Sequence, residues 1–153
     1  MNGYARGGGG DISTKKPEGD GFMIEKITWN EQILCYIVKA KEFNPEKTTF
    51  LTPPECNVQV GYIVHPAGHQ IPPHAHRAIE CVVDSSEVLL VRRGRCEVDV
   101  YNGENQLVAT RELQEGNLLI MVAGGHGFRM LEDTVLLEIR PGPYKGSDGK
   151  EQI

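Results

Sequence analysis

The feature that most constrains the fold is a succession of short apolar segments separated by turn-forming residues. The segments are rich in β-branched residues, and several alternate apolar with polar residues, as strands with one buried face do. None shows the sustained 3.6-residue period of an amphipathic helix. Tight turns are expected at Gly94 and at Asn102-Gly103, so we predict an all-β sandwich or barrel. The predicted strands lie at residues 23–29, 33–43, 58–64, 87–93, 95–101, 106–113, 117–123, 124–131 and 134–140.

A pair of histidines follows two consecutive prolines in the stretch GHQIPPHAH, residues 68–76. Pro72 and Pro73 argue against a helix there, so we predict a strand. Residues two apart on a strand point to the same face, so His74 and His76 would direct both imidazoles to one point. Two converging nitrogen donors are the beginning of a transition-metal site. Two surface histidines on an edge strand would show the same spacing.

The charge and hydropathy of the chain argue against several function classes. The 153 residues suit one domain, and 16 Lys and Arg against 21 Asp and Glu give a formal net charge of −5. This balance disfavours nucleic-acid binding and a polybasic membrane anchor. No apolar run approaches the length of a membrane span, and the N-terminal stretch lacks the apolar core of a secretory signal. We therefore expect a cytoplasmic protein without nucleic-acid or membrane partners, whose four cysteines are free thiols.

The spacing around the histidine pair resembles the first sequence motif of the cupin family. That motif has a glycine, five residues, His-x-His, three or four residues and a glutamate, then six residues and a second glycine. Here five residues separate Gly68 from His74, and three residues separate His76 from Glu80. The resemblance covers about residues 57–141. It implies a cupin-type jelly-roll β-barrel, also called a double-stranded β-helix.

Two glutamates compete for the carboxylate position of this motif. Counting forward from the histidine pair gives Glu80, whereas counting back from the turn glycine Gly94 gives Glu87. We place Glu87 first, because in the family the glutamate begins the strand that ends at the glycine turn. Glu87 also shares one strand face with Leu89 and Val91, which is the expected interior face. Glu80 stays open as the alternative, and a solvated surface carboxylate would explain either residue without a function.

A second family motif, weaker in this chain, contributes one more histidine. In the family a glycine precedes Pro-x-Gly by five residues, and a histidine follows after two more. Here Gly116 leads to Val122 and Gly124, with valine in place of the proline, and His126 arrives one residue early. The metal ligands implied by the resemblance are His74, His76, Glu87 and His126, with Glu80 as the alternative to Glu87.

Three imidazoles and one carboxylate suit a divalent first-row metal and leave coordination positions open for substrate or water. The resemblance implies a divalent Fe, Mn, Ni, Zn or Co ion and a small polar metabolite as substrate, with dioxygenase, isomerase or lyase chemistry all open. One alternative is a metal-independent nucleotide-sugar isomerase or epimerase, in which His74 or His76 transfers protons. Another is a non-enzymatic small-molecule binding module. A sugar-related substrate, a role in carbohydrate metabolism and a homodimer are further expectations from the resemblance.

Both ends of the chain are predicted to lie outside the folded domain. Residues 1–22 are glycine-rich and polar, so we expect a flexible N-terminal extension or linker. Residues 145–153 are expected to form a polar C-terminal tail. The cupin β-barrel domain would then occupy residues 23–144.

Overall fold

The computed structural model describes residues 24–39, 44–78, 86–142 and 152–153, and every regular element within them is a β-strand. The predicted all-β class is therefore confirmed. None of these residues belongs to a helix that is long and apolar enough to cross a membrane. The strands are β1 Ile24–Trp29, β2 Gln32–Lys39, β3 Thr49–Phe50, β4 Gly61–Tyr62, β5 Glu87–Arg93, β6 Arg95–Tyr101, β7 Leu107–Gln114, β8 Asn117–Met121, β9 Gly125–Met130 and β10 Val135–Ile139.

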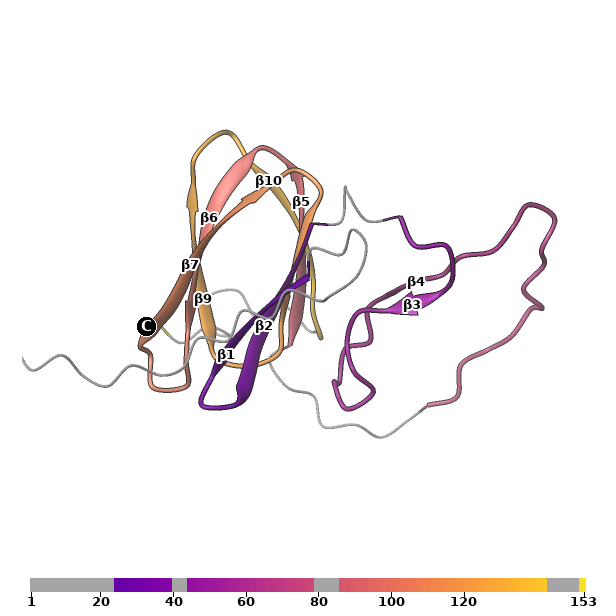
Figure 1. Cartoon of the computed structure of the whole chain (residues 1–153), viewed down its shortest axis with the longest axis horizontal. Coiled ribbons are helices and arrows are strands. Elements are labelled where there is room, and N and C mark those ends of the chain that lie inside the picture. The colour runs from indigo at the N-terminus through magenta and orange to yellow at the C-terminus, as the bar shows by residue number, and fades with distance from the viewer. Residues whose placement is uncertain (1–23, 40–43, 79–85, 143–151) are drawn as a thin grey trace, which may run out of the picture.

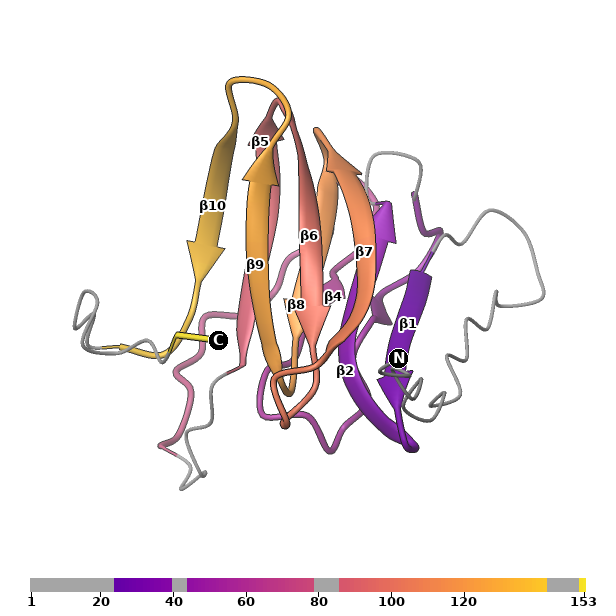
Figure 2. The same ribbon diagram turned by 90° about the vertical axis from the view of Figure 1, so that its left-hand side faces the viewer.

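Two antiparallel sheets face each other across the hydrophobic core (Figures 1 and 2). The larger sheet has five strands in the order β1-β2-β8-β5-β10, and the smaller has three in the order β7-β6-β9. Alternation along the strands creates the core, since Cys96, Val98 and Val100 on β6 are fully buried while the residues between them are partly exposed. From the facing sheet, Leu89 on β5 and Leu119 on β8 join the same core cluster. The core is therefore formed by the inner faces of both sheets.

The outer face of the five-stranded sheet carries a second apolar cluster, which residues 44–62 cover. Tyr36 and Ile120 contribute to this cluster from the sheet, and Leu51 contributes from the covering segment. Within that segment only the short strands β3 and β4 pair with each other. The strand predicted over residues 58–64 is therefore reduced to Gly61–Tyr62.

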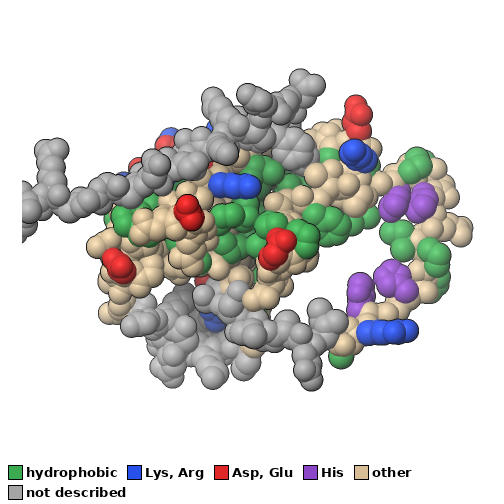
Figure 3. Space-filling model, turned by 60° about the horizontal axis from the view of Figure 1, so that its bottom comes forward, with side chains coloured by type: hydrophobic (Ala, Val, Ile, Leu, Met, Phe, Trp, Pro, Cys, Tyr) green, Lys and Arg blue, Asp and Glu red, His purple; other side chains and the backbone are tan. Residues whose placement is uncertain are grey.

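The strand predicted over residues 68–76 is wrong. Residues 63–78 contain no strand, and residues 65–78 are exposed throughout. They form a projecting segment on which histidine side chains gather, with open space between the segment and the body of the protein (Figure 3). The local chemistry explains this, because Pro66, Pro72 and Pro73 have no amide to donate to a ladder. Gly68 also has a φ of +84°, which interrupts an extended chain.

Gly94 forms a corner between the two sheets, whereas we predicted a tight turn between neighbouring strands. β5 and β6 do not pair with each other, because β5 belongs to the five-stranded sheet and β6 to the three-stranded sheet. Gly94 has a φ of +86°, and a Cβ at this position would lie 2.4 Å from the carbonyl oxygen of Asp133. Only glycine therefore fits where the chain crosses from one sheet to the other.

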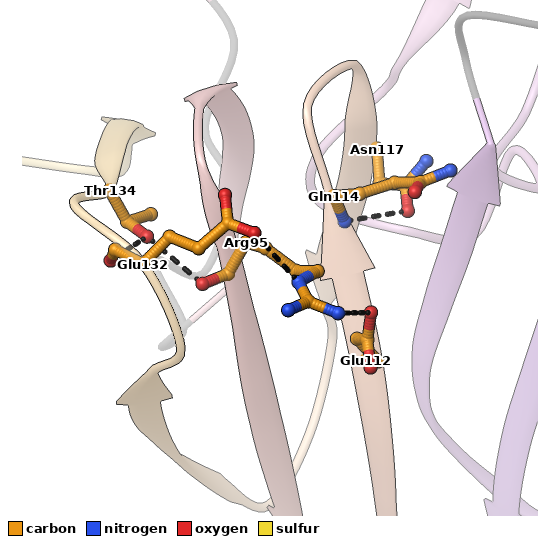
Figure 4. A network of polar contacts seen from close by, with 6 residues as sticks. All are labelled: Arg95, Glu112, Gln114, Asn117, Glu132 and Thr134. Atoms are coloured by element: carbon orange, nitrogen blue, oxygen red, sulfur yellow. Dashed lines mark hydrogen bonds and ion pairs between the residues drawn. The ribbon is translucent and has the colours of Figure 1, made fainter.

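The residue after this corner, Arg95, joins three segments of the chain (Figure 4). Its guanidinium donates to Glu112 on β7 at 3.2 Å and to Glu132 in the turn before β10 at 3.1 Å. Its carbonyl oxygen accepts a bond from the Thr134 hydroxyl at 3.1 Å. The guanidinium is thus engaged by two carboxylates from different segments.

The Asn102 side chain holds together the predicted hairpin between β6 and β7. It is buried, and its Oδ1 accepts bonds from the amides of Glu104 at 3.0 Å and Gln106 at 2.9 Å. We expect Asn102→Ala to lower the free energy of unfolding by about 2 kcal/mol, because it leaves two amides without their acceptor. Denaturant titration measures this change. Asn102→Asp keeps the acceptor and should lose less than half as much, and an equal loss would contradict this role.

Candidate metal centre

Glu87 is the first residue of β5, and its strand position turns its side chain toward the inner face of the sheet. It shares this face with Leu89 and Val91, both buried in the core between the sheets. The carboxylate end lies at the rim of the core, with 17% of the side chain exposed. The predicted direction of Glu87 is therefore the one observed, because the β5 strand runs without interruption from Glu87 to Arg93.

His126 is the second residue of β9, on the opposite sheet. In the β6–β9 register it lies beside Val100, which is fully buried. Its ring meets Phe128 edge to face, with 5.3 Å between centroids and an interplanar angle of 69°. Phe128 packs against the core, so His126 also faces the space between the sheets. The aromatic ring thus forms an apolar wall beside the imidazole.

These two side chains meet although 39 positions separate them in the sequence. Glu87 Oε2 lies 3.9 Å from His126 Nε2, which is too long for a direct hydrogen bond between these two atoms. Two donors that each lie about 2.0–2.2 Å from one ion can be at most about 4.4 Å apart. The 3.9 Å spacing is below this limit, so one divalent metal could contact both side chains.

No protein-family model, curated protein or solved structure matches this chain. The interpretation of the pair therefore depends on its own geometry and chemistry.

The other two predicted ligands, His74 and His76, lie on the projecting segment. Their ring centroids are 5.1 Å apart, and the two ring planes meet at 68°. Within the described part of the chain, no group of three or more His, Cys, Asp or Glu side chains is arranged to hold a metal. The structure therefore brings the predicted ligands together as two pairs, Glu87 with His126 and His74 with His76. The alternative carboxylate, Glu80, lies outside the described residues.

A backbone contact at His74 determines which of its nitrogens is available. Its Nδ1 lies 2.9 Å from the carbonyl oxygen of Pro72. A carbonyl oxygen only accepts hydrogen bonds, so Nδ1 carries the proton when this bond forms. The lone pair of a neutral ring is then on Nε2, as in histidines that bind metals. The sequence did not predict this contact, because it depends on the local path of the chain after Pro72.

Two other histidines, His65 and His69, stack on each other in the same segment. Their ring centroids are 3.9 Å apart and their planes differ by 11°. Neither residue belongs to the predicted ligand set. These residues therefore serve as matched controls for His74 and His76, since all four side chains are exposed.

Gly124 sets the backbone position just before His126. It has a φ of +72°, and a Cβ there would lie 2.1 Å from the carbonyl oxygen of Tyr101. The glycine thus allows β9 to begin directly against the end of β6. This close approach positions His126 at the rim of the core.

Cys35 and Cys96 are buried free thiols, as predicted, and Cys81 lies outside the described residues. Burial, followed by the charge of Glu25, raises the pKa of the Cys35 thiol to about 12, and burial also raises the pKa of Cys96.

Because the thiolate is the nucleophile, we expect iodoacetamide at pH 8 to modify half-exposed Cys56 more than about 100-fold faster than Cys35. Peptide mass spectrometry of the native protein measures both rates. Equal rates would contradict the burial of Cys35.

Proposed function

We propose that this protein is a cupin-type jelly-roll metalloprotein that binds a divalent first-row metal and acts on a small polar metabolite. Its ligands are His74, His76, Glu87 and His126. The observation that carries the proposal is the approach of Glu87 and His126 to 3.9 Å from opposite sheets. Neither residue is needed for the apolar core, and yet both point toward it.

A divalent metal is a partner that the Glu87 carboxylate and the His126 imidazole could share. A carboxylate and an imidazole at the rim of an apolar core lose hydration, and this loss must be offset by bonds to other groups. A divalent cation offsets it for both residues at once. The three imidazoles and one carboxylate of the full set are donors that Fe, Mn, Ni, Zn and Co all accept.

The donors on the projecting segment are suited to the same ion. The Pro72 carbonyl holds the proton of His74 on Nδ1, which presents Nε2 as the ligand. His76 follows two residues later, so an extended backbone would direct both rings to one side. This segment would supply the second half of the ligand set.

When bound, the metal supplies a Lewis acid that can polarise a carbonyl or hydroxyl oxygen of the metabolite. The four side chains hold the ion and leave positions open for the substrate. The Phe128 ring contacts the imidazole of His126 edge to face and packs against the core, so it forms an apolar wall on that side of the site. A substrate oxygen would therefore enter from the rim, where Glu87 and His126 are partly exposed.

Metal titration of untagged protein tests this proposal. We expect one high-affinity site for Mn(II) or Zn(II), and an affinity at least about 100-fold weaker in His126→Ala and in Glu87→Gln, because each removes one ligand. His65→Ala and His69→Ala are the controls and should bind as the wild type does. Unchanged affinity in both ligand variants would refute the site. A loss confined to the two control variants would place the metal elsewhere on the projecting segment.

A further inference from the structure

The apolar cluster on the outer face of the five-stranded sheet contains one buried polar atom without a partner. Tyr36 on β2 is 1% exposed, and its hydroxyl forms no hydrogen bond with any of the described residues. Buried hydroxyls normally have a partner, because they have lost their bonds to water. The Tyr36 hydroxyl is therefore a donor that a further polar atom can satisfy.

The neighbouring strands do not supply an acceptor to this hydroxyl. In the strand registers Tyr36 lies between Lys26 on β1 and Ile120 on β8. The Lys26 ammonium lies 5.7 Å from the centroid of the Tyr36 ring, where it interacts with the ring face. A lysine ammonium only donates hydrogen bonds, and an isoleucine side chain forms none. The acceptor must therefore come from the side of the covering segment, residues 44–62, which packs on this cluster through Leu51.

Cys56 and Glu55 of the covering segment lie near the Tyr36 phenol. Burial, and after it the charges of Cys56 and Glu55, raise the pKa of Tyr36. Glu55 is exposed, whereas Cys56 is half-buried. The Cys56 thiol is thus reachable from solvent, and it lies on the side of the cluster from which an acceptor for Tyr36 must come.

Hydrogen bonds fix the loop that carries Cys56. The amide of Leu51 donates to the carbonyl oxygen of Val60 at 2.7 Å, which closes the loop at its base. The side-chain nitrogen of Gln59 donates to the carbonyl oxygens of Pro53 and Cys56, both at 2.8 Å. The turn is therefore held from inside the loop, so the position of the sulfur is defined.

We propose that Cys56 is a modification site, which hydrogen peroxide oxidises to a sulfenic acid, and that the Tyr36 hydroxyl donates a hydrogen bond to the new oxygen. This oxygen is a better acceptor than the weakly accepting sulfur of the thiol. The hydroxyl has no partner in the reduced protein and gains one on oxidation. The site lies on the outer face of the sheet, so the inference does not rest on the proposed function.

The oxidation is a two-electron step. The thiol releases its proton, and the thiolate sulfur attacks one oxygen of hydrogen peroxide. An S–O bond forms as the O–O bond breaks, and the other oxygen leaves as hydroxide, which takes up the released proton to form water. The sulfur is oxidised and the peroxide is reduced, and no further reactant is needed.

Dimedone trapping in the whole 153-residue chain tests this inference, with a chelator present so that bound metal does not contribute. Catalase removes the peroxide, dimedone is added after increasing delays, and peptide mass spectrometry measures the adduct at Cys56. One hydrogen bond of ordinary strength corresponds to about a 2- to 10-fold effect. We therefore expect the sulfenic acid to persist at least about 3-fold longer in the wild type than in Tyr36→Phe. Equal persistence in the two proteins, or no adduct at Cys56 in the wild type, would overturn the inference.

Tyr101→Phe is the matched control, because it removes a phenol hydroxyl from β6 in the other sheet and should leave the persistence unchanged. Iodoacetamide should modify reduced Cys56 at the same rate in Tyr36→Phe as in the wild type, since the hydroxyl is not bonded to the reduced thiol. The melting temperature of reduced Tyr36→Phe should be equal or higher, because the substitution removes an unpartnered hydroxyl. An effect of Tyr101→Phe on the sulfenic acid, a changed iodoacetamide rate or a lower melting temperature would each contradict the assigned role of Tyr36.

Discussion

Gly124→Ala is expected to lower the free energy of unfolding by about 3 kcal/mol or more. The new Cβ would lie 2.1 Å from the Tyr101 carbonyl oxygen, so the backbone of β6 or β9 must shift. The φ of +72° adds strain for any residue with a side chain. Denaturant unfolding measures the loss. Since the shift also displaces His126, we expect the same variant to bind metal more weakly.

Gly127→Ala provides the matched control three residues further along β9. A Cβ there meets nothing within 4 Å. Replacing a strand glycine without steric conflict reduces the entropy of the unfolded chain, so we expect a gain of about 0.5 kcal/mol. If the two variants were equally stable, the close approach between β9 and Tyr101 would not exist in solution.

Leu119→Ala is expected to cost about 2–5 kcal/mol, because it removes a side chain from the centre of the core. Leu119 is fully buried on β8, between Ile37 of β2 and Leu89 of β5 in the strand registers. Its inner face packs toward the three-stranded sheet, so the cavity cannot be filled from solvent. Thermal or denaturant unfolding gives the value.

The comparison for this variant is Leu107→Ala at the first position of β7. Leu107 is 55% exposed, so its truncation should cost less than about 1 kcal/mol. Similar losses for both leucines would contradict the packing of the two sheets around β8.

Much of the fold follows from local patterns in the sequence. The strands β1, β2 and β5 to β10 all coincide, to within one residue at a boundary or inside it, with segments that were predicted from apolar residues and turn signals; β2 begins one residue early and β7 ends one residue late. Which strands pair with each other was harder to predict from the sequence. The turn at Gly94 was predicted to join neighbouring strands, whereas it connects two different sheets. Strand order depends on contacts between distant segments, and a turn glycine does not specify them.

The candidate site was predicted unevenly for a similar reason. Glu87 was correctly predicted to face inward, because alternation along an intact strand determines side-chain direction. His126 was predicted as a ligand from its motif position, and no strand face was predicted for it. The strand predicted around His74 and His76 is absent, since three prolines and Gly68 weaken the pairing of this segment. The spacing of the histidines in the sequence therefore identified them as candidate ligands, but it did not predict where they lie in the structure.

X-ray absorption spectroscopy at the metal edge of the loaded, untagged wild-type protein tests the central claim most directly. With one equivalent of Zn(II), the account predicts a first shell of nitrogen and oxygen ligands at about 2.0–2.2 Å, with outer-shell scattering from three imidazoles. His126→Ala should reduce that scattering to two imidazoles, whereas His69→Ala should leave it unchanged. Imidazole scattering that does not change in His126→Ala, or a wild-type protein that retains no metal, would contradict the account.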